Sequence, residues 1–214
     1  MRFPITIIGT GYVGLVTGVC LAKLGGEVVS HDIDTEKIRR IKRGQVPFYE
    51  PSVARLLVKY KTRLSFTSSL DEALSKARFV FICVGTPPKK SGEADLRAYF
   101  KVIGAIGAFL KRENSKERKF IINKSTVPIG TAREADQILG KKYGVRNAHI
   151  LSNPEFLREG KAVSDFLNPD RVVIGVPRKD REAKKAIFQL YRAFRCPKVV
   201  VSWETAEMIK YASN

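Results

Sequence analysis

Short apolar runs alternate with amphipathic stretches along the chain. The apolar runs are rich in β-branched and aromatic residues at consecutive positions, which is typical of strands buried on both faces of a parallel sheet. The predicted strands are 5–8, 27–31, 64–66, 78–84, 119–123, 148–152, 171–176 and 198–202. Helical periodicity between them predicts helices at 13–24, 35–43, 95–112, 132–139 and 181–194, a short helix with Pro51 in its first turn, and another opened by Ser69. This alternation predicts a doubly wound, mostly parallel α/β sheet with right-handed crossovers and helices on both faces.

Three glycines follow the first predicted strand at the spacing G-x-G-x-x-G. Gly9 permits a tight turn, Gly11 lets a pyrophosphate approach the backbone, and Gly14 lets the next helix pack close to the strand. The N-terminus of that helix favours the negative charge of the phosphates. Because a strand precedes the glycines and a helix follows them, we predict a Rossmann-type dinucleotide site at this turn.

An acidic residue stands where such a site needs one. Asp32 ends the second predicted strand, eighteen positions after Gly14, close to the roughly 20 positions typical of the carboxylate that binds the adenosine ribose. A carboxylate there accepts hydrogen bonds from the 2′- and 3′-hydroxyls and repels a 2′-phosphate. The sequence therefore favours NAD over NADP, against the simpler alternative of a glycine-rich turn followed by an unrelated surface aspartate.

Length and composition set outer limits on the interpretation. The 214 residues can form one large core, or one domain and part of a second. The sequence has neither an apolar run long enough to cross a membrane nor the pattern of a signal peptide, so we expect a cytoplasmic protein without a membrane partner. The three cysteines lack metal-binding spacing. Cys20 and Cys83 are predicted to be core residues, and no metal site is predicted.

The formal net charge of +18 leaves several interpretations open. Such a surface could bind nucleic acid, could await an acidic part absent from this sequence, or could attract an anionic nucleotide substrate. The basic residues are spread over many helices and loops, including 37–43, 111–119 and 179–185, without interleaved aromatic residues. We therefore favour attraction of a nucleotide and expect no nucleic-acid partner.

Residues 203–214 have a helical pattern and reach the last residue of the sequence without a capping signal. Lys210 and Asn214 are four positions apart and share one face of this helix. We therefore divide the chain into a dinucleotide-binding domain, 1–202, and the beginning of a central linking helix, 203–214. We expect the chain to be the N-terminal half of a larger enzyme.

Six segments together resemble one known family. They are Gly-Thr-Gly-Tyr-Val-Gly-Leu at 9–15, Gly-Thr-Pro at 85–87, Lys-Ser-Thr-Val-Pro-Ile-Gly-Thr at 124–131, Asn-Pro-Glu-Phe-Leu-Arg-Glu-Gly at 153–160, Pro-Asp-Arg at 169–171 and Ala-Glu-Met-Ile-Lys-Tyr-Ala-Ser-Asn at 206–214. In this order they resemble the UDP-glucose/GDP-mannose dehydrogenase family over the whole chain. The segments at 153–160 and 169–171 resemble most its UDP-glucose 6-dehydrogenases.

The resemblance implies the NAD-binding half of an enzyme that oxidises the C6 alcohol of a nucleotide sugar to a carboxylate, with two NAD reduced. For UDP-glucose the product would be UDP-glucuronate. The resemblance also implies which residues bind NAD, from the glycine-rich loop to the later strand ends. These are Gly9, Gly11, Tyr12, Val13, Gly14, Asp32, Lys37, Thr86, Pro87, Ser125, Thr126 and Glu159.

Catalytic roles are implied by the same resemblance. Glu155 would act as a base in the hydrolysis of a thioester, and Thr126 would help to position the water. Lys210 and Asn214 would stabilise the developing oxyanion and hold the sugar. The substrate site would comprise Glu155, Phe156, Leu157, Arg158, Glu159, Lys210 and Asn214. The family's nucleophilic cysteine is expected beyond the last residue of this chain, since none of Cys20, Cys83 and Cys196 lies in the family's cysteine motif.

Two further interpretations stay open. The chain could be a non-catalytic NAD-binding redox sensor with an acidic partner, or the corresponding half of a GDP-mannose or other UDP-sugar dehydrogenase. The motif at 124–131, Glu155 and the Lys210/Asn214 pair favour an enzyme, because a sensor requires none of them. The expected partners are a UDP-sugar and the remaining C-terminal half, in an enzyme that we expect to be a homo-oligomer.

Overall fold

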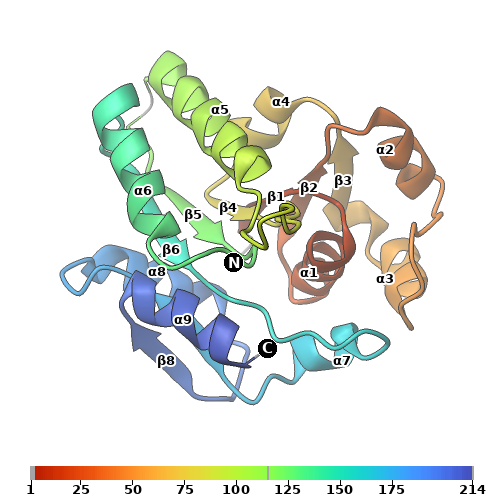
Figure 1. The fold of residues 1–214 in the computed structure, drawn as a ribbon. Helices are drawn as coiled ribbons and strands as arrows, with labels where there is room; N and C mark the ends of the chain where they lie inside the picture. The colour runs from red at the N-terminus through yellow and green to blue at the C-terminus, as the bar shows by residue number, and fades with distance from the viewer. Residues whose placement is uncertain (1–2, 115, 214) are drawn as a thin grey trace.

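The chain folds around one eight-stranded sheet, seen in a computed structural model that describes residues 3–114 and 116–213 (Figure 1). The strand order is β3-β2-β1-β4-β5-β6-β7-β8. The strands are β1 Pro4–Ile8, β2 Glu27–His31, β3 Leu64–Thr67, β4 Phe79–Ile82, β5 Lys119–Asn123, β6 Ala148–Ser152, β7 Val172–Gly175 and β8 Lys198–Val201. Strands β1 to β6 are parallel, which confirms the predicted doubly wound α/β sheet.

Helices cover both faces of the sheet. They are α1 Tyr12–Lys23, α2 Thr35–Lys42, α3 Val53–Lys59, α4 Leu70–Ser75, α5 Arg97–Glu113, α6 Thr131–Gln137, α7 Ala162–Leu167, α8 Arg181–Leu190 and α9 Trp203–Ser213, with a 3₁₀ turn at Lys61–Arg63 and a π-helical turn at Ile138–Lys142. No helix of the described residues is long and apolar enough to cross a membrane.

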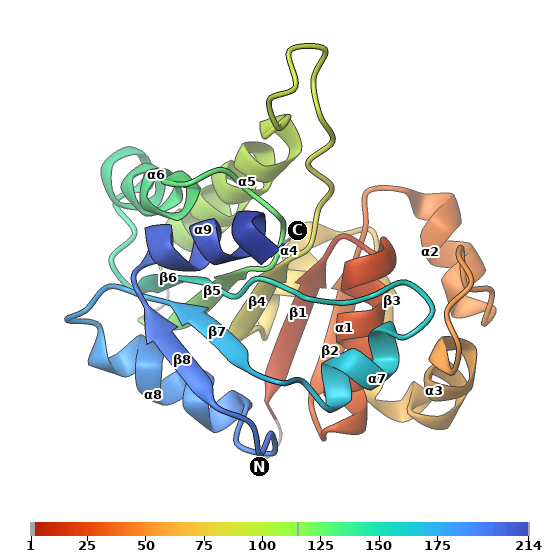
Figure 2. The same cartoon turned by 60° about the horizontal axis from the view of Figure 1, so that its bottom comes forward.

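Alternate residues of each central strand enter two separate hydrophobic cores. In β4, Phe79 and Phe81 pack with residues of α1, α3, α7 and α8, whereas Val80 and Ile82 pack with residues of α4, α5, α6 and Trp203 of α9. All four side chains of β4 are buried. A strand that is covered on both faces has no polar side to present, and this explains its uninterrupted apolar sequence. Figure 2 shows the same arrangement, with α9 and α8 on opposite sides of the last strands.

The last two strands reverse the direction of the sheet. Strand β7 runs antiparallel to β6 and is paired with it at Ser152 and Gly175, while β8 runs parallel to β7. The connection from β6 to β7, residues 153–171, contains the six-residue helix α7 and otherwise irregular chain. Because β7 pairs antiparallel with β6, the chain re-enters the sheet from the edge at which it left.

Some predicted elements need correction. Helix α7 is not apparent from the sequence pattern, and the helix predicted over 181–194 ends at Leu190. Pro51 lies before α3 and not in its first turn, because Ser52 precedes the helix with a φ of 74°, in the left-handed region. These errors lie in short or irregular segments, where periodicity carries little information.

Helix α9 packs on the domain through buried polar contacts. The Trp203 indole donates to the Ile150 carbonyl at 2.9 Å. The Glu207 carboxylate accepts from the backbone N–H groups of Gly130 at 2.7 Å and Ala132 at 2.8 Å, at the beginning of α6. Burial raises the pKa of Glu207, against the lowering effect of these two hydrogen bonds.

The boundary that we place between residues 202 and 203 stays a prediction.

The turn after β1 depends on two glycines. Gly9 has a φ of 95°, which residues with a side chain rarely adopt, and a Cβ on it would lie 2.7 Å from the Cys83 carbonyl oxygen. A Cβ on Gly14 would lie 1.9 Å from the Gly9 carbonyl oxygen. Glycine at position 14 therefore lets the first turn of α1 approach the end of β1.

Gly14→Ala is expected to destabilise the fold by about 3 kcal/mol, because the added methyl group meets a backbone oxygen that cannot move without displacing the turn. Urea denaturation of the purified chain measures this. Gly11→Ala is the matched control, because nothing lies within 4 Å of a Cβ at that position. A smaller loss of about 1 kcal/mol is expected, because Gly11 is the N-cap of α1, where alanine is less favourable than glycine. Equal midpoints for the two variants would contradict the packing role of Gly14.

Candidate cofactor and substrate site

The glycine-rich turn lies at the point where the strand order reverses. Strand β1 is paired with β2 on one side and with β4 on the other, and the loops that follow β1 and β4 leave the sheet at the same edge. Gly9 N donates to the His31 carbonyl at 2.8 Å, and Cys83 N donates to the Ile8 carbonyl at 2.8 Å. In open α/β sheets, ligands bind in the crevice at this position.

Gly11 leaves an open space beside the first turn of α1. Its φ of −69° is accessible to any residue, and a Cβ there would have no neighbour within 4 Å. Neither backbone strain nor packing within the chain therefore requires glycine at this position. Gly11 is the N-cap of α1, and no side chain caps the helix. The first N–H groups of the helix point at this space, which suits a pyrophosphate.

Asp32 is buried at the end of β2 and held by several donors. Its Oδ2 accepts from Thr10 N at 2.9 Å, from Thr10 Oγ1 at 2.8 Å and from Lys37 Nζ at 2.9 Å. Its Oδ1 accepts from Asp34 N at 3.1 Å. Burial by itself raises the pKa of Asp32, but these hydrogen bonds outweigh that effect and lower the pKa. The carboxylate is therefore ionised at neutral pH, and Oδ1 retains accepting capacity for a hydroxyl group.

The loops after β4 and β5 contact each other at the same edge. Thr86 Oγ1 donates to the Thr126 carbonyl at 2.6 Å, and Ser125 Oγ donates to the Val84 carbonyl at 2.7 Å. Thr86, Ser125 and Thr126 are half-buried, whereas Pro87 is exposed. The structure thus brings together the predicted cofactor residues of these two loops.

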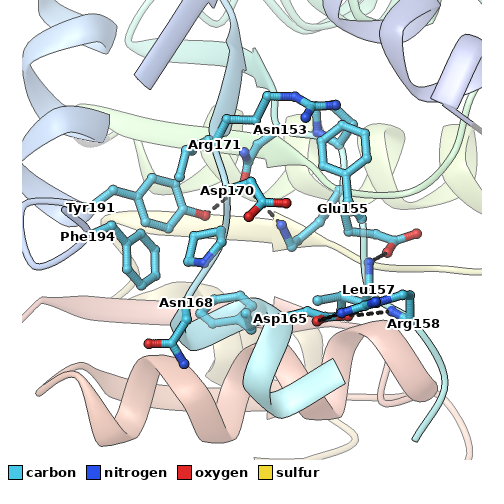
Figure 3. Close-up of a pocket in the computed structure, with 16 residues that line it drawn as sticks. Asn153, Glu155, Leu157, Arg158, Asp165, Asn168, Asp170, Arg171, Tyr191 and Phe194 are labelled. Carbon is cyan, nitrogen blue, oxygen red and sulfur yellow. Dashed lines mark hydrogen bonds and ion pairs between the residues drawn. The ribbon is translucent and has the colours of Figure 1, made fainter. Parts of the chain in front are cut away.

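A cavity of about 400 Å³ opens beside β6, a volume typical of small-molecule sites (Figure 3). The segment 153–158, helix α7, the segment 168–172 and two aromatic residues after α8 surround it. Its lining residues are Lys124, Asn153, Pro154, Glu155, Phe156, Leu157, Arg158, Asp165, Phe166, Asn168, Pro169, Asp170, Arg171, Val172, Tyr191 and Phe194. The predicted substrate residues 155–158 therefore form one wall of a real cavity.

Lys210 of α9 reaches this wall. Its Nζ lies 2.9 Å from Glu155 Oε1, and the exposed fractions of the two side chains are only 9% and 12%. Glu155 Oε2 accepts from Leu157 N at 2.7 Å. The structure thus joins two of the four predicted catalytic residues directly, although they are far apart in the sequence. Asn214, the predicted partner of Lys210, lies outside the described residues.

Lys124 is buried in the wall of the cavity. No role for this residue was predicted from the sequence. Its Nζ donates to Asn153 Oδ1 at 3.1 Å, and the Tyr191 hydroxyl donates to the same oxygen at 2.7 Å. Asn153 Nδ2 donates to the Val173 carbonyl at 2.8 Å. Burial lowers the pKa of Lys124. Its position at the end of a buried strand was the available signal.

Positive groups flank Phe156 on the cavity wall. Arg171 Cζ lies 5.2 Å and Lys210 Nζ 5.6 Å from the centroid of the ring. Arg158 is exposed and forms an ion pair with Asp165 at 2.7 Å. Glu159, predicted to bind NAD, is exposed beside the same segment. The arrangement can stabilise negative charge, since cations line it and aromatic faces hold them.

Glu50 is a buried carboxylate that contacts Tyr12 of the glycine-rich loop. Like Lys124, it had no role predicted from the sequence. Glu50 accepts from the Tyr12 hydroxyl and from Gly160 N, the latter at 2.9 Å. Burial, followed by the hydrogen bond to Glu50, raises the pKa of Tyr12 to about 12. No motif identified Glu50, because it lies in an irregular loop between two exposed residues, Tyr49 and Pro51.

Cys20 and Cys83 do not face the site as reactive thiols. Cys20 and Cys83 are buried, and burial raises the pKa of each to about 12. Both are core residues, as the sequence predicted. No group of three or more His, Cys, Asp or Glu side chains in residues 3–114 and 116–213 could hold a metal ion.

The fold and the glycine-rich site define a Rossmann-type dinucleotide-binding domain. The profile of the UDP-glucose/GDP-mannose dehydrogenase family, NAD binding domain, matches residues 3–195. The chain therefore belongs to this family, and its cofactor is NAD.

Individual relatives support this assignment over the whole chain. The UDP-glucose 6-dehydrogenase TuaD of Bacillus subtilis is 44% identical over 216 residues, covering 98% of this chain and 45% of the relative. The structure of a UDP-glucose dehydrogenase from Pyrobaculum islandicum has a TM-score of 0.92 at 36% identity, covering 100% of this chain and 49% of the other. A ternary complex of GDP-mannose dehydrogenase from Pseudomonas aeruginosa has a TM-score of 0.93 at 35% identity, covering 99% and 49%. The chain spans about half the length of these three proteins.

Gly11→Val is expected to abolish NAD binding while the chain stays folded. The side chain enters the space that the pyrophosphate needs, and its Cβ has no protein atom within 4 Å. Isothermal titration with NAD measures binding, and circular dichroism verifies folding. Normal NAD affinity in this variant would show that the glycine-rich loop is not the phosphate site.

Asp32→Ala is expected to weaken NAD binding and to narrow its preference over NADP. The substitution removes the acceptor for the ribose hydroxyls and frees Lys37 Nζ, now 2.9 Å from Asp32, to meet a 2′-phosphate. Thermal-shift titrations with both cofactors measure the preference. Glu36→Ala, which removes an exposed carboxylate on the same helix as Lys37, is the control. An unchanged preference after Asp32→Ala would contradict the role of Asp32.

Proposed function

We propose that this chain is the cofactor-binding half of an NAD-dependent dehydrogenase that oxidises the C6 alcohol of UDP-glucose to the carboxylate of UDP-glucuronate. The observation that carries the proposal is the contact of Lys210 with Glu155 on the wall of a cavity beside the dinucleotide fold. A module that only senses the redox state of NAD would not need a buried acid–base pair beside a substrate-sized cavity.

The residues present fit the cofactor. The open space at Gly11, the uncapped beginning of α1 and the ionised Asp32 correspond to the pyrophosphate and the adenosine ribose. When bound, NAD supplies the hydride acceptor for the oxidation. Thr86 and Thr126, joined by their hydrogen bond, line the edge where the strands β4 and β5 end, and we assign them to the cofactor.

Lys210 and Glu155 have complementary roles in this proposal. The Lys210 ammonium donates to the C6 oxygen and stabilises negative charge as it develops there, an effect typically worth about 3–4 kcal/mol in the transition state. Glu155 accepts a proton from the water that hydrolyses the thioester, and Leu157 N keeps its second oxygen in place. Thr126 helps to position that water. Asn214 would assist Lys210 from the same helix face.

The proposal needs a nucleophile that Cys83 cannot provide. Its thiol is buried in the core with a pKa raised to about 12, so it forms no thiolate at neutral pH. We assign the nucleophilic cysteine, and most contacts with the nucleotide base, to a C-terminal half that acts together with this chain. UDP-glucose is our proposed substrate. GDP-mannose and other UDP-sugars are the alternatives, because a GDP-mannose dehydrogenase matches the fold equally well.

The chain alone is expected to bind NAD without oxidising UDP-glucose. Supplied with the C-terminal half of a matched relative, it should form about two NADH for each UDP-glucuronate, since an alcohol loses four electrons on becoming a carboxylate. Absorbance of NADH and mass spectrometry of the uronate measure this, with GDP-mannose assayed in parallel. Uronate production by the chain alone would contradict the assignment of the nucleophile to a second half, and preferential oxidation of GDP-mannose would contradict the substrate.

In the complemented enzyme, Lys210→Ala is expected to lower kcat by about 100- to 1,000-fold, because it removes an oxyanion donor. NAD affinity should change by no more than about twofold, since Lys210 contacts Glu155 and Phe156 and not the glycine-rich loop. Lys101→Ala, on the exposed side of α5, is the matched control. Full activity of Lys210→Ala, with a normal melting temperature, would contradict the catalytic role.

A further inference from the structure

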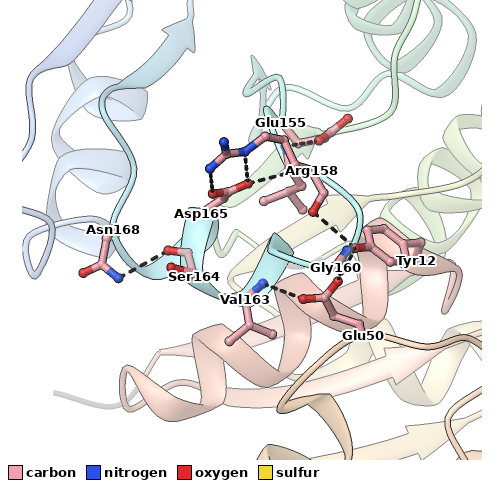
Figure 4. A network of polar contacts seen from close by, with 10 residues as sticks. Tyr12, Glu50, Glu155, Arg158, Gly160, Val163, Ser164, Asp165 and Asn168 are labelled. Atoms are coloured by element: carbon pink, nitrogen blue, oxygen red, sulfur yellow. Dashed lines mark hydrogen bonds and ion pairs between the residues drawn. The ribbon is translucent and has the colours of Figure 1, made fainter.

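Glu50 is a buried carboxylate that the proposed chemistry does not use. It lies in the loop between α2 and α3 and is only 6% exposed. Its Oε2 accepts from the Tyr12 hydroxyl and from Gly160 N, and its Oε1 accepts from Val163 N at 3.4 Å (Figure 4). A buried carboxylate is costly unless it is hydrogen-bonded, and here backbone N–H groups at the beginning of α7 supply that stabilisation.

The Tyr12 hydroxyl donates to Glu50, and the Arg158 carbonyl, at 3.5 Å, is its more distant second acceptor. Gly160 N donates to the Tyr12 oxygen at 3.2 Å, so the hydroxyl proton of Tyr12 is available for Glu50. Burial and the Glu50 contact raise the pKa of Tyr12 to about 12, which keeps that proton in place at neutral pH. The Phe48 ring packs on the Tyr12 ring with a centroid distance of 4.9 Å. The Tyr12 side chain is thus held in one orientation.

Three segments that are distant in sequence meet at this carboxylate. Tyr12 is the first residue of α1 and follows Gly11, where the pyrophosphate is expected. Gly160 ends the segment that carries Glu155 on the cavity wall, and Val163 lies in the first turn of α7, which also lines the cavity. Gly160 N is therefore connected to the cofactor loop both directly, through the Tyr12 hydroxyl, and through Glu50, whereas Val163 N is connected to it through Glu50.

We propose that Glu50 is a positioning residue that couples the cofactor site to the segment 153–160. Bound NAD restrains the beginning of α1 and with it Tyr12, and the hydrogen bonds through Glu50 pass this restraint to Gly160 and Val163. The sugar-binding wall is then ordered when the hydride acceptor is in place. The inference rests on the proposed function, because it takes 153–160 to be the wall that receives the sugar.

The coupling predicts a change that a purely structural contact would not produce. In the chain as it stands, NAD should slow hydrogen exchange at the amides of Gly160 and Val163 by about tenfold, the size expected for directly coupled buried groups. In Glu50→Gln the effect of NAD on these two amides should fall below about twofold, because the amide has only one oxygen. Its NH₂ group cannot accept, and it must face either Val163 N or the two donors now at Oε2. NMR of the labelled chain, with and without NAD, measures each amide.

Tyr12→Phe is a second variant and a smaller change. It removes only the hydroxyl group, so Glu50 still accepts from Gly160 and Val163, yet the connection to α1 is broken. The double variant should lose no more of the NAD effect than either single variant, because both interrupt one connection. Glu36→Gln, an exposed glutamate paired with Arg39, is the matched control and should retain the full effect.

The outcomes separate the two proposals. If the wild-type chain binds NAD and Glu50→Gln retains the tenfold effect, the coupling is refuted while the cofactor assignment stands. Additive losses in the double variant would also refute it. If Glu50→Gln does not fold, the Tyr12→Phe result decides, and an undiminished effect there refutes the coupling. A wild-type chain that fails to bind NAD overturns both the proposed function and this inference.

Discussion

The common direction of strands β1 to β6 is the constraint on which the site depends. Parallel strands end at one edge, so the polar loops that follow them converge there without any long connection. The glycine-rich loop, the end of β2 and the segments beginning at Lys124 and Asn153 thus share one edge although they are spread over most of the chain. Because β7 runs antiparallel to β6, the segment that connects them, with α7, lies at this edge and covers one side of it.

The loops at this edge have backbone N–H groups that make no hydrogen bond within a strand. Buried carboxylates accept hydrogen bonds from several of these groups. Asp32 accepts from Thr10 N and Asp34 N, Glu50 from two amides at the beginning of α7, and Glu207 from two at the beginning of α6. Hydrogen bonds to charged groups contribute about 1.5–3 kcal/mol each, enough to hold irregular segments in one arrangement. The same carboxylates fix the segments that line the dinucleotide crevice and the cavity.

The sequence predicted the central sheet well because its strands are buried on both faces, and this leaves continuous apolar runs such as Phe79–Ile82. The glycine spacing and Asp32 likewise predicted the dinucleotide site, because each residue has a local physical role there. What the sequence did not predict arises from contacts between distant segments. Glu50 has no neighbouring residue that signals its partners, and α7 is too short for helical periodicity. The joining of Lys210 to Glu155 was implied by the family resemblance alone, since neither residue type nor spacing brings them together.

The ion pair of Lys210 and Glu155 is better explained by a role in the proposed reaction than by a contribution to the stability of the fold. Partly burying two charges costs desolvation that their attraction barely offsets, so apolar residues would hold α9 on the cavity wall as well. Lys124 adds a further buried cation, and the charge of Lys210 acts with burial to lower its pKa. The cavity is lined by three cations, Lys124, Arg158 and Arg171, and by three carboxylates, Glu155, Asp165 and Asp170. Lys210, in contact with Glu155, tips this balance toward positive charge, in the same sense as the +18 net charge that attracts an anionic ligand from solution.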